Sequence, residues 1–211
     1  MDIVIIGAGG HGKVVADVVL SAGGHRVVGF LDADERLAGQ TVLDLPVIGP
    51  INLLGKLKQS KKARGAIVAI GDNRVRAGYA AEVLSAGLEL ISAIHPGASV
   101  ARSARIGQNV VIAAGAVVCV DATIADSAII NTSAVVDHEC VVHTAAHICP
   151  GALLAGRVEI GQRAFVGLGA KVIQCLSVGE DAVIGAGAVV TRDVPPGARV
   201  IGVPARPMGG G

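Results

Sequence analysis

Between Ile94 and Pro195 a branched aliphatic residue returns at every sixth position, without an insertion or deletion. The register holds through seventeen consecutive blocks of six residues. The first positions are Ile94, Val100, Ile106, Ile112, Val118, Ile124, Ile130, Val136, Val142, Ile148, Leu154, Ile160, Val166, Val172, Val178, Ile184 and Val190. A fixed short period sustained over so many blocks is the signature of a repeat solenoid.

The fifth position of each block is nearly always small. It holds Ala98, Ala104, Val110, Ala116, Ala122, Ala128, Ala134, Cys140, Ala146, Ala152, Val158, Ala164, Ala170, Leu176, Ala182, Ala188 and Val194. Six residues make one short strand and a corner, so the branched residue is expected to fill the core and the small one to lie at the turn. Three such faces close a coil, which predicts that residues 18 apart stack around one continuous core. Second-position glycines are expected to serve the corners through their conformational freedom, at Gly107, Gly161, Gly179 and Gly185.

The first 93 residues have a different pattern. A continuous apolar run from Asp2 to Ile6 predicts a strand, Lys13 to Ala22 has helical spacing, and Arg26 to Leu31 predicts a second strand. Strand, helix and strand in this order make a βαβ unit. The chain is therefore expected to contain a Rossmann-like domain over residues 1–93, an all-β solenoid over residues 94–195 and a tail over residues 196–211.

A glycine-rich turn joins the first strand to the first helix. Gly7, Gly9 and Gly12 match the spacing G-x-G-x-x-G, and Asp32 follows at the end of the second strand. Such a turn directs backbone N–H groups of a helix N-terminus at a phosphate. A domain of about 93 residues holds only one mononucleotide half of a dinucleotide fold. With His11 inside the turn, this favours a nucleotide-containing ligand that is not a redox cofactor.

The rest of this domain is predicted to continue the α/β pattern. The expected elements are a helix from Pro50 to Gln59, a strand from Arg64 to Ile70, a helix through Ser85 capped by Asp72, and a last strand from Leu88 to Ile94. Asn73, Arg74 and Arg76 then lie at the carboxyl edge of the sheet, where open α/β sheets bind ligands. Asn73 and Arg76 are thus candidate ligand contacts.

Composition narrows the class of protein. The net charge of +1 gives no electrostatic case for nucleic acid or an acidic membrane. One Tyr, two Phe and no Trp suit a narrow core of Val, Ile and Ala. Four unpaired cysteines, no signal peptide and no membrane span predict a soluble, cytoplasmic protein.

Histidines provide the candidate chemistry of the solenoid. Three of the six cluster at His138, His143 and His147. His138 takes the third position of its block and is flanked by Asp137 and Glu139. A carboxylate can orient an imidazole and raise its basicity, so His138 is a candidate general base.

Several short stretches along the chain together match one family of proteins. They are Gly7-Ala8-Gly9-Gly10-His11-Gly12, Phe30-Leu31-Asp32, Gly71-Asp72-Asn73-Arg74-Val75-Arg76, Asn131-Thr132, Asp137-His138-Glu139-Cys140, His147 and Gly202-Val203-Pro204-Ala205. With these stretches the whole chain resembles the nucleotide-amino-sugar N-acetyltransferases of the bacillosamine and perosamine pathways and the related sialic acid O-acetyltransferases, within the left-handed β-helix hexapeptide acyltransferases. The left-handed form of the helix is implied by this resemblance alone.

The resemblance also implies site residues. It makes His138 the catalytic base, Glu139 its supporting carboxylate, with Asp137 a neighbour of similar potential, and Asn131 an asparagine near the acceptor. For acetyl-CoA it implies contacts from His147, Gly156 and Ala186, with the Gly156 N–H at the thioester carbonyl. For the nucleotide sugar it implies contacts from Gly9, Gly10, His11, Asp32, Asn73 and Arg76.

The resemblance further implies a homotrimer whose active sites lie between subunits, with acetyl-CoA as cosubstrate, a nucleotide amino sugar as acceptor and no metal. One departure from the family pattern is that Asp32 is followed by Ala33 before Asp34, where the family has two adjacent acids. Gly202 to Arg206 is expected near the CoA adenine, and Gly209 to Gly211 is expected to be disordered.

Three alternatives stay open. Acetylation of a sialic acid or other sugar hydroxyl would use the same scaffold. A γ-carbonic-anhydrase-like metal enzyme would use His138 and His143, but Arg102 stands where the third zinc ligand would be. A non-catalytic solenoid with a nucleotide-sensing head is the third.

Overall fold

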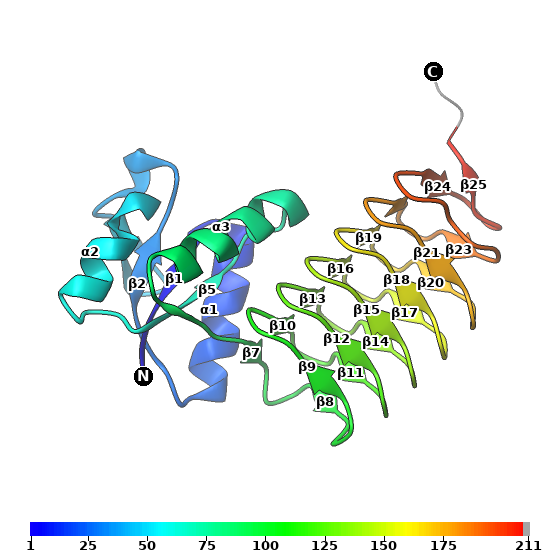
Figure 1. The fold of residues 1–211 in the computed structure, drawn as a ribbon, viewed down its shortest axis with the longest axis horizontal. Coiled ribbons are helices and arrows are strands. Elements are labelled where there is room, and N and C mark those ends of the chain that lie inside the picture. The colour runs from blue at the N-terminus through cyan, green and yellow to red at the C-terminus, as the bar shows by residue number, and fades with distance from the viewer. Residues whose placement is uncertain (209–211) are drawn as a thin grey trace. The chain divides into compact units, whose positions relative to one another are not determined.

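The computed structural model describes residues 1–208, and the end of the tail, 209–211, where disorder was predicted, lies outside the described residues. The chain forms two compact units, Met1–Pro96 and Gly97–Gly211. Figure 1 shows an α/β fold in the first and a stack of β-coils in the second. The functions that the sequence analysis attached to these parts stay predictions. No helix among the described residues is long and apolar enough to cross a membrane.

The first unit is a Rossmann-like sheet in the order β3-β4-β2-β1-β5-β6. Its strands are β1 (Asp2–Ile6), β2 (Arg26–Leu31), β3 (Thr41–Val42), β4 (Leu45–Gly49), β5 (Gly65–Val68) and β6 (Glu89–Leu90), followed by β7 (Ala93–Ile94). Its helices are α1 (Gly10–Ala22), α2 (Leu54–Gln59), α3 (Asn73–Ser85) and the 3-10 turns η1 (Glu35–Leu37) and η2 (Ile51–Leu53). The residues from Ile3 to Ile6 are fully buried, because a central parallel strand is covered on both faces.

Most of the predicted elements are confirmed. β1 and β2 have the predicted bounds, and Asp72 caps α3 by accepting hydrogen bonds from the N–H groups of Arg74 and Val75. The predicted strand from Leu88 to Ile94 is wrong as a single element, since it is broken into β6 and β7. The β3–β4 hairpin was not predicted. Its turn residues Leu43 and Asp44 have φ of 48° and 60°. This left-handed backbone conformation is unusual for these residue types, so no sequence signal predicted the turn.

The second unit is a β-helix of two-residue strands in three parallel sheets. Sheet one contains β10 (Val111–Ile112), β13 (Ile129–Ile130), β16 (His147–Ile148), β19 (Phe165–Val166), β22 (Val183–Ile184), β24 (Arg199–Ile201) and the antiparallel β25 (Arg206–Pro207). Sheet two contains β8 (Ser99–Val100), β11 (Val117–Val118), β14 (Val135–Val136), β17 (Leu153–Leu154), β20 (Lys171–Val172) and β23 (Val189–Val190). Sheet three contains β9 (Arg105–Ile106), β12 (Thr123–Ile124), β15 (Val141–Val142), β18 (Glu159–Ile160) and β21 (Ser177–Val178).

The predicted repeat is confirmed in both register and burial. Val111 pairs with Ile129, and Ile129 pairs with His147, so residues 18 apart lie side by side. From Val110 to Val194 the first- and fifth-position side chains form one buried core, apart from the half-buried Leu176. The register ends earlier than predicted, because Val194 bridges to Val178, only sixteen residues before it.

The special backbone conformation of the corners lies at another position of the block than the sequence analysis predicted. Left-handed backbone recurs at the fourth position, as at Asn109, Asp121, Glu139 and Arg157, where φ is 56° to 60°. The second-position glycines have no such φ. They are needed because a Cβ at Gly161 would overlap the backbone of Glu180 in the next coil.

Candidate active site

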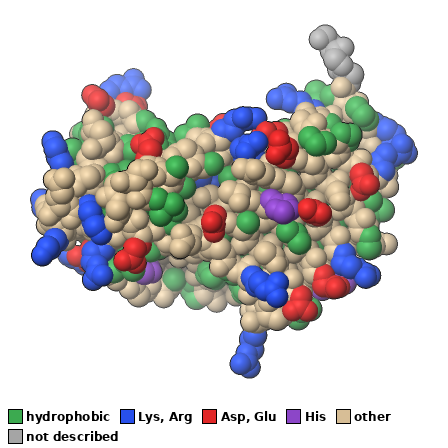
Figure 2. Space-filling model, in the orientation of Figure 1, with side chains coloured by type: hydrophobic (Ala, Val, Ile, Leu, Met, Phe, Trp, Pro, Cys, Tyr) green, Lys and Arg blue, Asp and Glu red, His purple; other side chains and the backbone are tan. Residues whose placement is uncertain are grey.

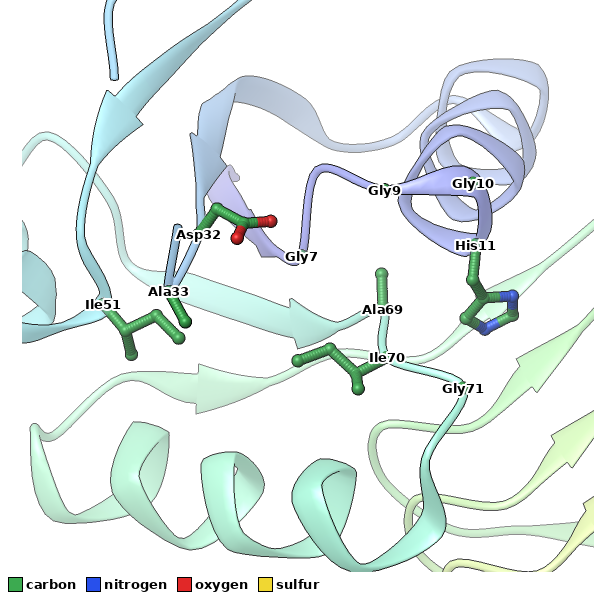
Figure 3. Close-up of a pocket in the computed structure, with 10 residues that line it drawn as sticks. All are labelled: Gly7, Gly9, Gly10, His11, Asp32, Ala33, Ile51, Ala69, Ile70 and Gly71. Carbon is green, nitrogen blue, oxygen red and sulfur yellow. The ribbon is translucent and has the colours of Figure 1, made fainter. Parts of the chain in front are cut away.

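A pocket of about 290 Å³ lies at the carboxyl edge of the Rossmann-like sheet (Figure 3). It is lined by the turn between β1 and α1, by the end of β2 and by the residues after β5. Figure 3 shows Asp32 and His11 on either side of the glycine turn. This is the edge where the sequence predicted a nucleotide site.

The glycines of the turn have two separate roles. A Cβ at Gly7 would meet the carbonyl of Ala69, and a Cβ at Gly12 would overlap the carbonyl of Gly7. These two glycines are required by packing. At Gly9 and Gly10 a Cβ would meet nothing, and both residues line the pocket. Packing therefore does not require glycine at these two positions of the turn, and their backbone is open to the pocket.

Asp32 holds the turn together. One carboxylate oxygen accepts the N–H of Ala8 at 2.7 Å, and the other accepts the N–H of Asp34 at 2.9 Å. These bonds fix the first residues after β1 and β2 against one another. A contact between Asp32 and a nucleotide stays a prediction.

Arg76 lies fully buried behind the pocket. Its guanidinium donates to the carbonyls of Ile70 and Gly71 at 2.9 and 3.2 Å and to the Oδ1 of Asn73 at 2.8 Å. Burial lowers the pKa of Arg76 to about 10, against the raising effect of the Asp72 carboxylate. Arg76 and Asn73 thus shape the loop that closes the pocket, and their contact with a substrate stays a prediction.

His11 is neutral at pH 7. Desolvation by burial, and next the charge of Arg76, lower its pKa to about 4. A neutral imidazole in the phosphate-binding turn acts as a hydrogen-bonding group rather than a cation.

The solenoid presents His138 at the corner that follows β14. The His138 Nδ1 lies 3.0 Å from the Oε2 of Glu139, and both side chains are about half exposed. Asp137 accepts the backbone N–H of His138 at 2.7 Å instead. Glu139 is therefore the carboxylate that lies against the ring, and the Nε2 forms no hydrogen bond within residues 1–208.

Gly156 makes room for this ring. A Cβ there would overlap the Nε2 edge of His138, which lies one coil away. The Gly156 N–H forms no hydrogen bond within residues 1–208. The Gly156 backbone and the Nε2 edge of the imidazole thus lie next to one another.

A pocket of about 400 Å³ borders His138. It is lined mainly by apolar residues of the two preceding coils, together with Asp137 and His138; the other lining residues are Ser99, Ala101, Val117, Val118, Cys119 and Val120.

Asn131 and His147 form a second cluster. The Nδ2 of Asn131 lies 3.0 Å from the Nε2 of His147, while its Oδ1 accepts the N–H of Thr132. Because Nδ2 can only donate, the His147 proton is on Nδ1. His147 is buried and packs edge-on against Phe165, with ring centroids 5.3 Å apart.

The two clusters lie at different corners of the prism. Asn131 and Ala186 follow strands of sheet one, so they lie at the first corner, beside His147 of β16. His138 and Gly156 follow strands of sheet two, at the second corner. One solenoid does not gather all the predicted residues.

The second corner also carries residues that the sequence analysis missed. The carbonyls of Val120, His138 and Gly156 accept N–H groups from successive coils, which stacks these residues in a column. Gln174 and the exposed Arg192 follow in the next two coils, and Arg102 precedes Val120. Counting steps of 18 from His138 would have found Gln174 and Arg192.

The histidine pair of the metal-enzyme alternative is separated by a strand. His138 and His143 lie at opposite ends of β15, and the Nε2 of His143 lies 2.8 Å from the Oε1 of Glu159. Within residues 1–208 no three His, Cys, Asp or Glu side chains come together in a metal-binding group.

Comparison with known proteins places this geometry in a family. The PglD N-terminal domain profile matches residues 2–83. Perosamine N-acetyltransferase from Caulobacter crescentus, crystallised as a histidine variant with CoA and GDP-perosamine, is 43% identical over 100% of this chain and 98% of its own, with a TM-score of 0.95. The acetyltransferase domain of PglB from Neisseria gonorrhoeae FA1090 is 40% identical over 98% and 99% of the two chains, with a TM-score of 0.91. The chain belongs to the nucleotide-amino-sugar N-acetyltransferase family.

A curated family member matches over a shorter stretch. UDP-N-acetylbacillosamine N-acetyltransferase from Bacillus subtilis (strain 168) is 34% identical over 115 residues, which are 54% of this chain and 51% of that protein. The match thus spans about half of that relative. Within the family, the fold includes the left-handed β-helix that the resemblance implied.

Gly156→Ala should lower the rate of acetyl transfer without unfolding the protein. The added methyl group would push the His138 ring off its position, and a misplacement of about 1 Å can cost about 100-fold in rate. Acetyl transfer and the urea unfolding midpoint would be measured together. Gly78→Ala is the control, since a Cβ there meets nothing. A Gly156→Ala enzyme of normal rate would show that this contact does not matter.

His11 should make the first unit sensitive to acid. Its pKa of about 4 lies below the unfolded value of 6.5, so the neutral ring contributes stability above pH 6.5 that is lost as pH falls to 4. The loss relative to His11→Gln, which does not titrate, should reach up to about 3 kcal/mol. Urea unfolding of both proteins at several pH values checks this. Parallel pH curves would contradict it.

Proposed function

We propose that the protein transfers the acetyl group of acetyl-CoA to the amine of a nucleotide-linked amino-dideoxy sugar, a UDP- or GDP-4-amino-4,6-dideoxyhexose, for surface glycan synthesis. The observation that carries the proposal is the His138–Glu139 pair, whose Nε2 lies against Gly156, a residue with an unused backbone N–H. The complexes of the relatives with CoA, acetyl-CoA and GDP-perosamine support it.

The chemistry follows from these two groups. The sugar amine attacks the thioester carbonyl while the His138 Nε2 takes a proton from the nitrogen. The Gly156 N–H donates to the oxygen that becomes negative in the tetrahedral intermediate. The C–S bond then breaks, and CoA leaves as the thiolate, which is protonated. Glu139 stabilises the imidazolium formed in between, so no covalent enzyme intermediate is needed.

The distance between His138 and Arg192 along the second corner matches the length of the pantetheine arm of CoA. Arg192 lies three coils from His138, which is about 14 Å at the ~4.8 Å spacing of neighbouring strands. An extended pantetheine arm of about thirteen bonds covers about 15 Å at the advance per bond of an extended chain. Arg192 forms no ion pair within residues 1–208 and is placed to meet the CoA diphosphate.

A neighbouring solenoid completes the site in this proposal. The outward residues of sheet two are mainly apolar, with Val117, Val135, Leu153 and Val189 beside Ser99 and Lys171. Sheet three is more polar, with Arg105, Thr123, Glu159 and Ser177 beside Val141. A second copy packed on the apolar face would bring its Asn131 and Ala186 corner towards His138. We therefore propose a homotrimer with acetyl-CoA between subunits, located in the cytoplasm, where the four free cysteines stay reduced.

The activity is tested with a panel of 4-amino-4,6-dideoxy nucleotide sugars and acetyl-CoA, by following the free thiol. Product mass and sensitivity to hydroxylamine separate amide from ester products. Release of thiol with a sialic acid but with none of the nucleotide sugars would refute the proposed acceptor.

His138→Ala should lower kcat by about 10²–10⁴-fold, the usual contribution of a general base. Glu139→Gln keeps the shape but removes the charge that orients the ring, so its effect should be smaller. His143→Ala is the matched control, because His143 also pairs with a glutamate at an exposed corner. Retention of most of the rate in His138→Ala would refute its assignment as base.

Arg192→Ala should raise the KM for acetyl-CoA by about 10-fold, the value of one charge-assisted hydrogen bond, and leave kcat unchanged. With acetyl-pantetheine, which lacks the diphosphate, the variant and the parent protein should behave alike. Arg199→Ala is the control, since Arg199 is also exposed but lies on sheet one. An equal effect with both donors would exclude a diphosphate contact.

A further inference from the structure

The positive charge of the chain is concentrated in one segment. Residues 56–64 carry five cations and no acid, and we call these side chains the basic patch: Lys56, Lys58, Lys61, Lys62 and Arg64. The whole chain has a net charge of +1, so the rest of the chain carries −4. The low net charge is therefore the sum of a strongly positive segment and a negative remainder of the chain.

The patch surrounds α2 and the turn after it. Figure 2 shows Lys and Arg side chains gathered over this end of the first unit. The segment leads into the amino edge of the sheet, where the N–H of Arg64 donates to the carbonyl of Asp2. This edge is opposite to the carboxyl edge that carries the pocket of Gly9 and His11.

Two hollows adjoin within the patch and share Lys61. One, of about 500 Å³, has Val28, Ile48 and Leu57 as its apolar lining and Lys61 and Lys62 as its unpaired cations, and it also includes the Asp2–Arg26 ion pair. The other, of about 370 Å³, is lined by Lys58, Lys61 and Arg64, with Gln59 and Ala63. The surface is thus concave and cationic, with apolar side chains at the base of the larger hollow.

Neighbouring acids do not neutralise the patch. Asp2 is held by Arg26 at 2.6 Å, and Glu89 is linked to Arg64 only through backbone atoms. None of the five cations forms an ion pair with another residue in the described part of the chain. All five charges are available to a partner.

We propose that the basic patch docks on an anionic phospholipid surface. A cluster of four to eight cations next to an amphipathic element attracts such surfaces, and a phosphate headgroup with its glycerol carbons matches a cationic hollow with an apolar base. Single-stranded nucleic acid fits less well, because its bases need aromatic platforms and the patch contains no aromatic residue.

Docking through this patch is peripheral. Leu54 and Leu57 of α2 are buried, so no large apolar side chain of the helix is free to insert into the bilayer. The contact is electrostatic and salt-sensitive, and it leaves the pocket at the carboxyl edge open to its ligand. The net charge of +1 gives no electrostatic case for an acidic membrane, but it averages over the basic patch, whose local charge is +5.

The test is co-sedimentation of the full chain with phosphatidylglycerol–phosphatidylcholine vesicles and with pure phosphatidylcholine vesicles. Binding is expected only to the anionic vesicles. It should disappear between about 0.1 M and about 1 M salt, as the Debye length falls from ~10 Å to ~3 Å. The triple variant Lys58→Glu, Lys61→Glu, Lys62→Glu should bind about 100-fold more weakly.

A charge-matched control carries Arg105→Glu, Arg199→Glu and Arg206→Glu, all exposed in the second unit, and should keep vesicle binding. Thiol release from acetyl-CoA in vesicle-free solution should be unchanged in the patch variant, so failure of the docking proposal and failure of the proposed activity are separate results. Equal binding to both vesicle types, unweakened binding of the patch variant, no binding at about 0.1 M salt, or tighter binding to a single-stranded oligonucleotide than to anionic vesicles would each overturn the proposal.

Discussion

The hydrogen bonds between successive coils are the constraint on which the second unit depends. Each strand is only two residues long, so no strand is stable by itself, and every coil needs the coils above and below. Residues 18 apart are therefore fixed at a spacing of ~4.8 Å, whatever their side chains are. The core needs only the first and fifth positions. The remaining positions can therefore hold functional side chains, each at a fixed height along the axis of the solenoid and at a fixed corner.

This constraint also explains why the candidate site is divided. The distance from Asn131 to His138 in the sequence spans one strand, β14, so the two residues must lie at its opposite ends. A rigid prism cannot fold its corners together, unlike the turns of the first unit, where Asp32 draws two loops onto one another through Ala8 and Asp34. Under the proposed function, the two corners meet only when two copies pack side by side.

Prediction from the sequence was most accurate where the period of the hydrophobic pattern alone decides the structure. The inward residues of the solenoid and the bounds of β1 and β2 follow from hydrophobic pattern alone. Prediction failed where the structure depends on the local conformation of the backbone. The β3–β4 turn uses Leu43 and Asp44 at positive φ, and the corners use Arg157 and Glu139 at the position where glycine would be expected. In the candidate site, the cluster of histidines could be found from the sequence, but the buried bonds of Arg76 could not, because they depend on carbonyls that the fold leaves open.

The two carboxylates beside His138 show why residue type alone does not assign a role. Asp137 and Glu139 are equally close in sequence, and both can support a histidine. Asp137 accepts the backbone N–H of His138, a short-range bond typical of aspartate at turns. Glu139 has a φ of 58° because it occupies the fourth position of its block. Its longer side chain lies against the Nδ1 of His138. The repeat therefore selects which carboxylate can act on the ring, by imposing the left-handed corner on one and not on the other.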